Sequence, residues 1–182
     1  MIAYLWWFVF IISWNVFDRG ARTVAKAGAR SERLHSLVLA FGIVTLVLAP
    51  VTRDAGRMWT SPILDLFGLL SMAAGTAFCW WARRHLGRFW SAEVTRKEAH
   101  RVVDTGPYRF VRHPIYTGFI MIYAGMAIIC ASPMGVLAFA MMALGLWLKA
   151  RVEEQFLMEE LGIAAYGSYR ARTPMLMPRL RL

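Results

Sequence analysis

The stretch IYTGFIMIYAGMAIICASPMGVLAFAMMALGLWL, residues 115–148, consists of two apolar runs with one break between them. The runs are Ile115–Ala131 and Met134–Leu148, and the break is the pair Ser132-Pro133, which typically interrupts a helix. A helix needs about 17 to 25 apolar residues to cross the hydrocarbon core of a bilayer. The stretch therefore predicts a tight hairpin of two membrane helices.

The rest of the chain repeats this pattern of long apolar runs. It has 182 residues, of which 58% are hydrophobic and 14% aromatic, with a mean hydropathy of +0.46. This composition is far more apolar than that of a typical soluble domain. The sequence therefore predicts an all-α integral membrane protein with five transmembrane helices in a single membrane domain, residues 1–182. We expect three N-terminal spans within residues 1–82 and a motif-bearing half at residues 83–182. The three earlier runs are Met1–Phe17, Leu34–Val51 and Ile63–Ala82.

The 21 basic residues predict how these helices are oriented. Along the chain, the segments between the runs carry five, two, eight and none of them, and six lie from Lys149 onward. With five spans, this alternation satisfies the positive-inside rule if the N-terminus is outside and the C-terminus cytoplasmic. The net charge of +10 then lies mainly on the cytoplasmic face, where it favours anionic lipid headgroups and not nucleic acid. The last run is short, and its helical pattern continues through Lys149 and Arg151, whose long stems can reach the interface.

Few polar or reactive residues lie inside the runs. Cys79 and Cys130 are both surrounded by apolar residues, so we expect neither a disulfide framework nor a paired-cysteine metal site. An acid within a membrane helix is often functional. Asp65, however, follows Ser61-Pro62 by one turn, so it is interpreted as an acid near a helix cap at the external interface.

Polar residues are concentrated just before the fourth run, in GPYRFVRHPIYTG, residues 106–118. Pro114 suits the first position of a helix, where its missing N–H has no cost, and this places His113 at the helix entrance. If the helix begins earlier, the spacing of three or four residues places Arg109, Arg112, His113 and Tyr116 on one face. Spacing alone supports a ligand-binding site and an interfacial anchor of basic and tyrosine residues equally.

This stretch resembles the G-x-Y-x-x-x-R-H-P-x-Y-x-G motif of the isoprenylcysteine carboxyl methyltransferase family and of its relatives, the phospholipid methyltransferases. The tail is similar to the second motif of that family, although Leu161 stands where a phenylalanine is usual. In addition, three residues instead of two separate Gly162 from Tyr166. The matching tail residues are Glu153, Glu154, Leu157, Leu161, Gly162, Tyr166, Tyr169 and Pro178.

The resemblance implies a membrane enzyme that uses S-adenosylmethionine, bound on the cytosolic side by the C-terminal half, to methylate a lipophilic acceptor that enters from the bilayer. The closest motif similarity implies the carboxylate of a prenylated cysteine or an analogue as acceptor, with phospholipid N-methylation as the alternative. Methyl transfer from a sulfonium requires no metal, because it depends on orientation and exclusion of water. Two further alternatives are an NADPH-dependent membrane reductase and a membrane scaffold without enzymatic activity.

The resemblance also implies roles for individual residues. The implied cofactor-binding residues are Tyr108, Arg112, His113, Tyr116, Glu153, Glu154 and Tyr166. Arg151 and Glu154 are implied as catalytic residues, and Arg109 and Tyr169 as substrate-binding residues. Arg109, Arg112 and Arg151 are each candidates for holding an anionic group in bidentate fashion.

The same residues also permit structural interpretations. Glu153 and Glu154 can form a solvated helix face paired with Lys149 or Arg151, and the two tail tyrosines can simply pack the tail against the membrane surface. We expect His113 to be interfacial and to contribute little to helix packing. We also expect the hairpin to bring His113 and Glu154 to a similar depth. The loop LGRFWSAEVTRKEAHRVVDTGPY, residues 86–108, is expected to lie along the headgroups and to close over the cofactor.

Overall fold

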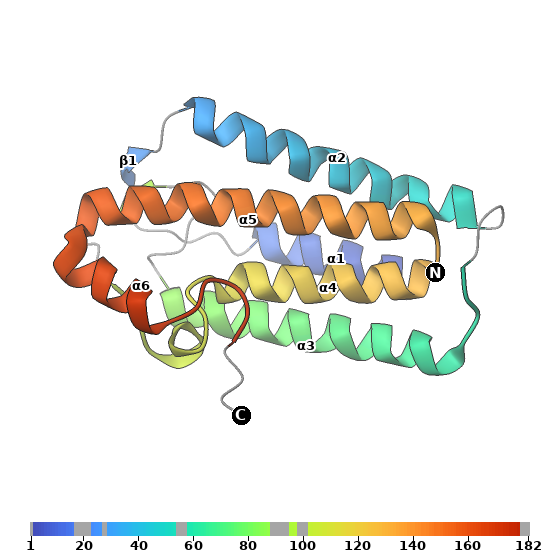
Figure 1. The fold of residues 1–182 in the computed structure, drawn as a ribbon. Helices are drawn as coiled ribbons and strands as arrows, with labels where there is room; N and C mark the ends of the chain where they lie inside the picture. Colours follow the sequence, from blue (N-terminus) through green and yellow to red (C-terminus); the bar gives the residue numbers. More distant parts are fainter. Residues whose placement is uncertain are drawn as a thin grey trace.

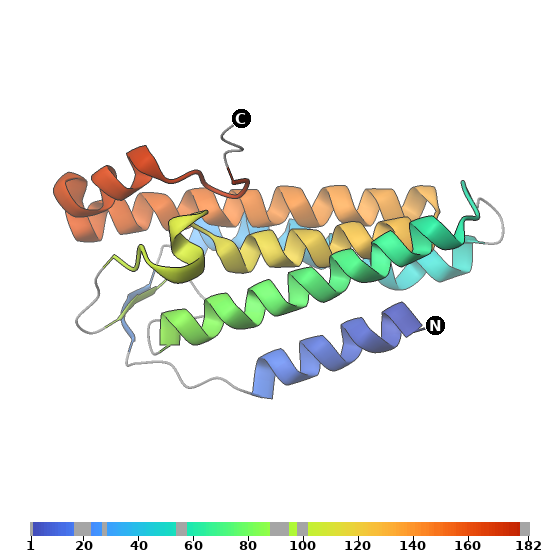
Figure 2. The same ribbon diagram turned by 90° about the horizontal axis from the view of Figure 1, so that it is seen from below.

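The protein is a bundle of long antiparallel helices, shown in Figures 1 and 2. The computed structural model describes residues 2–16, 23–26, 29–53, 58–87, 95–97 and 102–178. Successive long helices run in opposite directions, so the α4–α5 connection and the start of α3 lie at one end of the bundle. The elements are α1 (Ile2–Val16), β1 (Thr23–Lys26), α2 (Ala29–Arg53), α3 (Pro62–Leu86), β2 (Thr95–Lys97), η2 (Gly106–Arg109), α4 (Pro114–Cys130), α5 (Pro133–Gly162), η3 (Ile163–Gly167) and α6 (Ser168–Arg172).

Each of the five predicted apolar runs forms one of the long helices, and the predicted hairpin is confirmed. The α4 helix ends at Cys130 and is followed by Ala131, which adopts the left-handed conformation with φ 50°. Ser132 caps the next helix by accepting from Gly135 N at 3.1 Å. Pro133 occupies the first turn of α5, where its missing N–H is not needed. The start of α3 uses the same pairing of serine cap and proline, and Asp65 lies in its first turn as predicted.

The fifth helix is longer than its apolar run. It continues beyond Leu148 to Gly162, where a φ of 76° ends the regular helix. Positive φ is accessible to glycine without steric cost, which suits it to a helix end. The extension positions Glu153 and Glu154 beyond the apolar part of α5, near the residue that precedes α4.

Glycines allow α3 and α4 to pack closely. A Cβ built on Gly118 would lie 2.5 Å from Cys79 Sγ and 2.7 Å from the carbonyl oxygen of Gly75. A Cβ on Gly68 would lie 2.9 Å from the carbonyl oxygen of Gly125, so the same close approach recurs two turns away. Small residues at such contacts let helix backbones approach one another in membrane proteins.

The N-terminal helix is joined to the other helices by polar side chains. The Tyr4 hydroxyl donates to the carbonyl of Leu46 in α2 at 3.2 Å, and the Trp6 indole donates to Thr76 in α3 at 3.2 Å. Near the other end of α1, the buried Arg83 guanidinium lies 4.4 Å from the ring centroid of Trp14 and donates to its carbonyl. These contacts fix α1 against the bundle.

A short antiparallel ribbon is the one departure from the all-helical prediction among the described residues. β1 pairs with β2, with Thr23 opposite Lys97 and Lys26 opposite Thr95. The register has an irregularity between Thr23 and Ala25. The predicted closing loop, residues 86–108, contains β2, but much of it lies outside the described residues and its role stays a prediction.

The helices expose large apolar side chains, as expected of a protein that contacts lipid. Phe67 and Ile63 on α3 are 60% and 67% exposed, and α1 and α2 carry similar residues on their outer surfaces. Large exposed apolar side chains in this number indicate contact with a membrane or another protein. Two helices, Pro62–Leu86 and the segment from Pro133 to Arg172, are long and apolar enough to cross a membrane, and the three other apolar helices are shorter.

Candidate functional site

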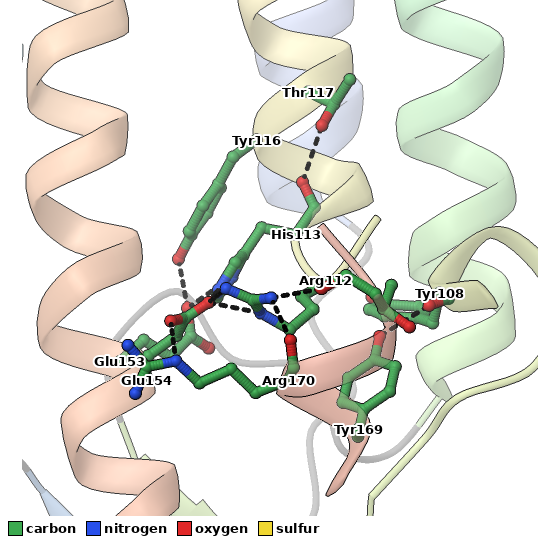
Figure 3. A network of polar contacts seen from close by, with 10 residues as sticks. Tyr108, Arg112, His113, Tyr116, Thr117, Glu153, Glu154, Tyr169 and Arg170 are labelled. Carbon is green, nitrogen blue, oxygen red and sulfur yellow. Dashed lines mark hydrogen bonds and ion pairs between the residues drawn. The ribbon is translucent and has the colours of Figure 1, made fainter. Parts of the chain in front are cut away.

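A cluster of polar side chains lies where the start of α4 meets the extension of α5 (Figure 3). His113 occupies the cap position of α4, directly before Pro114, but its side chain does not cap the helix. Its Nε2 lies 3.3 Å from Glu154 Oε1, and its Nδ1 lies 3.5 Å from Glu153 Oε2. The predicted proximity of His113 and Glu154 is therefore confirmed.

The helix of the motif begins at Pro114, as predicted, and not earlier, so the four residues do not share one helix face. Gly106–Arg109 forms a separate 3-10 turn, and α4 begins only at Pro114. Gly106 has a φ of 58°, and a Cβ on it would lie 2.7 Å from the ring of His85. Proline disfavours helical conformation in the residue before it, which explains why α4 does not start earlier.

Glu154 is the most buried acid of the cluster, at 2% exposure. Its Oε1 atom lies 2.6 Å from both Nε and Nη2 of Arg112. Among the described residues, its buried Oε2 atom has no hydrogen-bond partner, and the Arg170 Nε atom lies at an ion-pair distance of 3.5 Å. Because buried carboxylate oxygens normally have a donor, Oε2 marks a position that a ligand N–H or O–H group can satisfy.

Glu153 is more accessible than its neighbour, with 31% of its side chain exposed. It accepts a hydrogen bond from the Tyr116 hydroxyl at 2.8 Å. The Tyr116 ring stacks parallel to the His113 ring, with the centroids 5.3 Å apart. His113 itself is buried, so the expectation that it contributes little to packing is wrong.

The two carboxylates determine the protonation of His113. Burial lowers the pKa of His113, but its hydrogen bonds and ion pairs with Glu153 and Glu154 outweigh that effect, so the pKa is raised above its ordinary value. Both ring nitrogens face carboxylate oxygens, and only the imidazolium form can donate from both. The cluster therefore favours a charged histidine between two acids.

This arrangement predicts a pH-dependent stability. A histidine whose pKa is raised by folding stabilises the protein fully below its unfolded pKa of about 6.5, and the stabilisation is lost as the pH rises through the folded pKa. We expect the free energy of unfolding to fall above about pH 6.5, by up to about 1.4 kcal/mol per pH unit, in denaturant titrations of the purified protein. His113→Ala should remove this slope. An equal slope in that variant would show that other groups are responsible.

The tail after α5 forms part of the same cluster. Tyr166 and Tyr169 are both buried, and the Tyr169 hydroxyl donates to the carbonyl of Tyr108 at 2.6 Å. Residues Ile163–Gly167 form a turn of π-helix, which holds one residue more than the corresponding α-helical turn. This turn accommodates the extra residue between Gly162 and Tyr166, so both tyrosines still reach the interior.

Two of the predicted site residues lie outside the cluster. Arg109 is exposed and lies over the ring of Phe110, at 4.6 Å from the centroid. Arg151 is also exposed, with its guanidinium 5.5 Å from the ring centroid of Trp147. The structure brings together the other residues that were assigned to the site: Tyr108, Arg112, His113, Tyr116, Glu153, Glu154, Tyr166 and Tyr169.

The sequence interpretation missed two residues at this end of the bundle. His85 had no assigned role, but its ring stacks on that of Tyr108 and its Nε2 lies 2.8 Å from Thr105 Oγ1. Arg170 had no assigned role either, although its Nε lies 3.5 Å from Glu154 Oε2. No sequence pattern indicates the Arg170 contact, because 16 positions separate it from Glu154 and the intervening chain must first turn back.

Comparison with known proteins identifies the family. A family model described as phospholipid methyltransferase matches residues 64–163, more than half of the chain. The chain belongs to the phospholipid methyltransferase family. The match begins in α3 and ends just after α5, so it includes His113, Glu153 and Glu154. The resemblance found in the motifs is thus confirmed.

Curated relatives of this family member fall into two groups. A cobalt-zinc-cadmium resistance protein of Cupriavidus metallidurans is 30% identical over 146 residues, which is 77% of this chain and 62% of that protein. Protein-S-isoprenylcysteine O-methyltransferase B of Arabidopsis thaliana is 26% identical over 163 residues, or 85% of this chain and 83% of that protein. The chain therefore spans less than two thirds of the length of the metal-resistance relative. Within the parts of the chain that the structure describes, no three His, Cys, Asp or Glu side chains are placed to hold a metal ion.

Proposed function

We propose that this chain is an integral membrane methyltransferase that transfers the methyl group of S-adenosylmethionine to a lipophilic acceptor. The observation that carries the proposal is the carboxylate of Glu154, which lies within the family match next to His113. One of its oxygens is buried and has no hydrogen-bond partner among the described residues. A buried hydrogen-bond acceptor that lacks a donor destabilises the protein unless a ligand supplies that donor.

The residues of the cluster fit this cofactor. S-adenosylmethionine has an ammonium group and ribose hydroxyls, and all of these are donors that match the Oε2 atom of Glu154, which makes no hydrogen bond, and the partly exposed Glu153. When bound, it supplies a methyl group on a sulfonium, which is a strong electrophile. The protein would hold this group in line with the acceptor and exclude water, and neither task needs a strong base.

Ligand-dependent stability tests this proposal without requiring the acceptor. S-adenosylhomocysteine should raise the melting temperature of the purified protein, because a ligand at 100 times its Kd stabilises the folded state by about 2.7 kcal/mol. Stabilisation by NADPH instead would indicate a reductase. No shift with either ligand would favour a scaffold and contradict the proposal.

We further propose that α1 to α5 all cross the membrane, with the cluster on the cytoplasmic side. The antiparallel order of the helices and the alternation of basic residues support this topology. A topology reporter fused after Leu182 should therefore report the cytoplasm, and a reporter between α2 and α3 should report the outside. A C-terminal reporter on the external side would contradict the assignment.

Two acceptor classes remain candidates. The name of the Arabidopsis relative and the motif similarity support the carboxylate of a prenylated cysteine. The description of the matching family supports a phospholipid, methylated on its headgroup amine. The two differ in charge, because the carboxylate is anionic at neutral pH whereas the amine is cationic when protonated.

Lys149 gives a test of acceptor charge. It precedes Glu153 by one helical turn, on the side of the apolar part of α5, and its Nζ lies 5.8 Å from the ring centroid of Tyr116. A cation at this position favours an anionic acceptor and opposes a cationic one. In Lys149→Met, we expect the KM for an N-acetyl-S-farnesylcysteine acceptor to rise about 10-fold, the equivalent of about 1.4 kcal/mol.

The control for this test is Arg84→Met, which removes an exposed positive charge from the last turn of α3. It should leave that KM unchanged. Transfer to phosphatidylethanolamine in the wild-type protein, with no loss in Lys149→Met, would support the phospholipid acceptor instead.

A further inference from the structure

Arg112 makes more hydrogen bonds than any other side chain of the cluster. Besides its two contacts with Glu154, its Nη1 donates to the carbonyl of Arg170 at 3.0 Å and to the carbonyl of Thr173. The guanidinium has five N–H donors, and these bonds account for four of them. Its side chain is only 8% exposed. Contacts within the protein therefore use most of the N–H donors of Arg112, and few remain to bind an anionic ligand.

The same stretch of tail is bound to the entrance of α4 through backbone atoms. Arg112 N donates to the carbonyl of Pro174 at 2.9 Å, and His113 N donates to that of Met175 at 3.1 Å. The Thr117 hydroxyl donates to the carbonyl of Leu176 at 2.7 Å. Residues 173–176, named here the tail strap, thus run beside the residues that carry the cluster.

We propose that Arg112 is a positioning residue, and not a ligand for the cofactor or the acceptor. By occupying Oε1 of Glu154, it fixes the carboxylate so that Oε2 is presented to the ligand. By binding the carbonyls of Arg170 and Thr173, it connects that carboxylate to the tail strap. This inference rests on the proposed function, because it takes Glu154 as a cofactor contact.

A thermodynamic consequence follows from this connection. A ligand that donates to Oε2 favours the carboxylate orientation in which Arg112 also binds the tail strap. Docking of the strap and binding of the cofactor should therefore strengthen each other, and this coupling must be reciprocal. A direct ligand contact by Arg112 would not require any effect on the strap.

A double-mutant cycle separates these possibilities. The Kd of S-adenosylhomocysteine is measured by calorimetry for the wild type, Arg112→Gln, Glu154→Gln and the double variant. If Arg112 acts through Glu154, each single change should weaken binding about 10-fold or more, and the double variant should bind no more weakly than Glu154→Gln. Additive losses would show that Arg112 contacts the ligand directly, and would overturn the inference.

Two controls guard against a purely structural explanation. Arg172→Gln removes another contact of the C-terminal segment, a 2.5 Å ion pair between Arg172 and Asp104, which lies just before η2. This ion pair does not involve Glu154. Arg172→Gln should leave the Kd within about 2-fold, whereas Arg112→Lys should recover only part of the lost affinity because an ammonium cannot bridge all three acceptors. An unchanged Kd in Arg112→Gln with a lower unfolding midpoint would overturn the inference and leave Arg112 a purely structural residue.

Hydrogen exchange is measured on the wild-type protein, so the result does not depend on whether a variant folds. S-adenosylhomocysteine should slow the exchange of the Arg112 and His113 amides, which are bonded to the tail strap. The Met58 amide, bonded to the Ala131 carbonyl at the opposite end of the bundle, is the internal control. Binding without protection of the two amides would overturn the coupling, while a wild-type protein that does not bind the ligand would contradict the proposed function itself.

Discussion

Glu154→Gln is expected to cause the largest loss at the site, in both stability and cofactor affinity. The change removes the charge that neutralises the buried guanidinium of Arg112 while it keeps the shape of the side chain. Breaking a buried ion pair from one side typically costs about 3 to 5 kcal/mol, because the remaining charge is left without compensation. Loss of the charged hydrogen-bond acceptor for the ligand should also weaken S-adenosylhomocysteine binding by about 10- to 150-fold.

The matched control for this variant is Glu159→Gln. Glu159 lies on the same helix and is exposed, so its substitution removes the same charge without disturbing a buried pair. Denaturant midpoints and calorimetric Kd values should change in Glu154→Gln and stay near wild type in Glu159→Gln. Equal effects in the two variants would mean that only the net charge matters, and would exclude Glu154 as a specific contact.

Gly118→Val is expected to be the most damaging change in the helix packing. The new side chain would lie against Cys79 and the backbone of Gly75, where even a Cβ is too close, so α3 and α4 would have to separate. Overpacking of this kind costs up to about 3 kcal/mol, and occasionally more, because neither backbone can shift alone. Since His113 directly precedes α4, S-adenosylhomocysteine affinity should fall as well.

Ala140→Val serves as the control, since it also introduces a valine into a helix, but at an exposed position of α5. The variants are compared by unfolding midpoint and by Kd in the same detergent. A Gly118→Val protein as stable as Ala140→Val would show that the α3–α4 contact can relax, and would contradict the argument from close packing.

Most of the helical architecture was predictable from local sequence. Long apolar runs mark the helices, and the pairs Ser61-Pro62 and Ser132-Pro133 mark two of their starts, because a serine cap and a proline at the first position act within one turn. The β1–β2 ribbon was not predictable in this way. Its strands are three and four residues long, too short to show an alternating pattern, and they pair across about 70 residues of chain.

The site was predictable only in part. The paired motifs indicated His113, Glu153 and Glu154, and the structure brings these residues together. Glu154 also continues a row of buried α5 residues spaced four apart, Met142, Leu146 and Ala150, so helical periodicity could have shown that it faces inward. Arg151 lies off that row and is exposed, which the same periodicity could have revealed.

The sequence by itself determined the family, the helical hairpin and the residue types of the cluster, because each depends on neighbours within a few residues or on a short motif. Only the tertiary structure decided how these groups are used. Arg112 binds the carboxylate of Glu154 and the carbonyl of Thr173, although 42 and 61 positions separate them from it in the sequence. One guanidinium can serve all its acceptors only after α4, α5 and the tail have packed together. The choice of acceptors for its hydrogen bonds is therefore a property of the packed bundle, and no local pattern in the sequence encodes it.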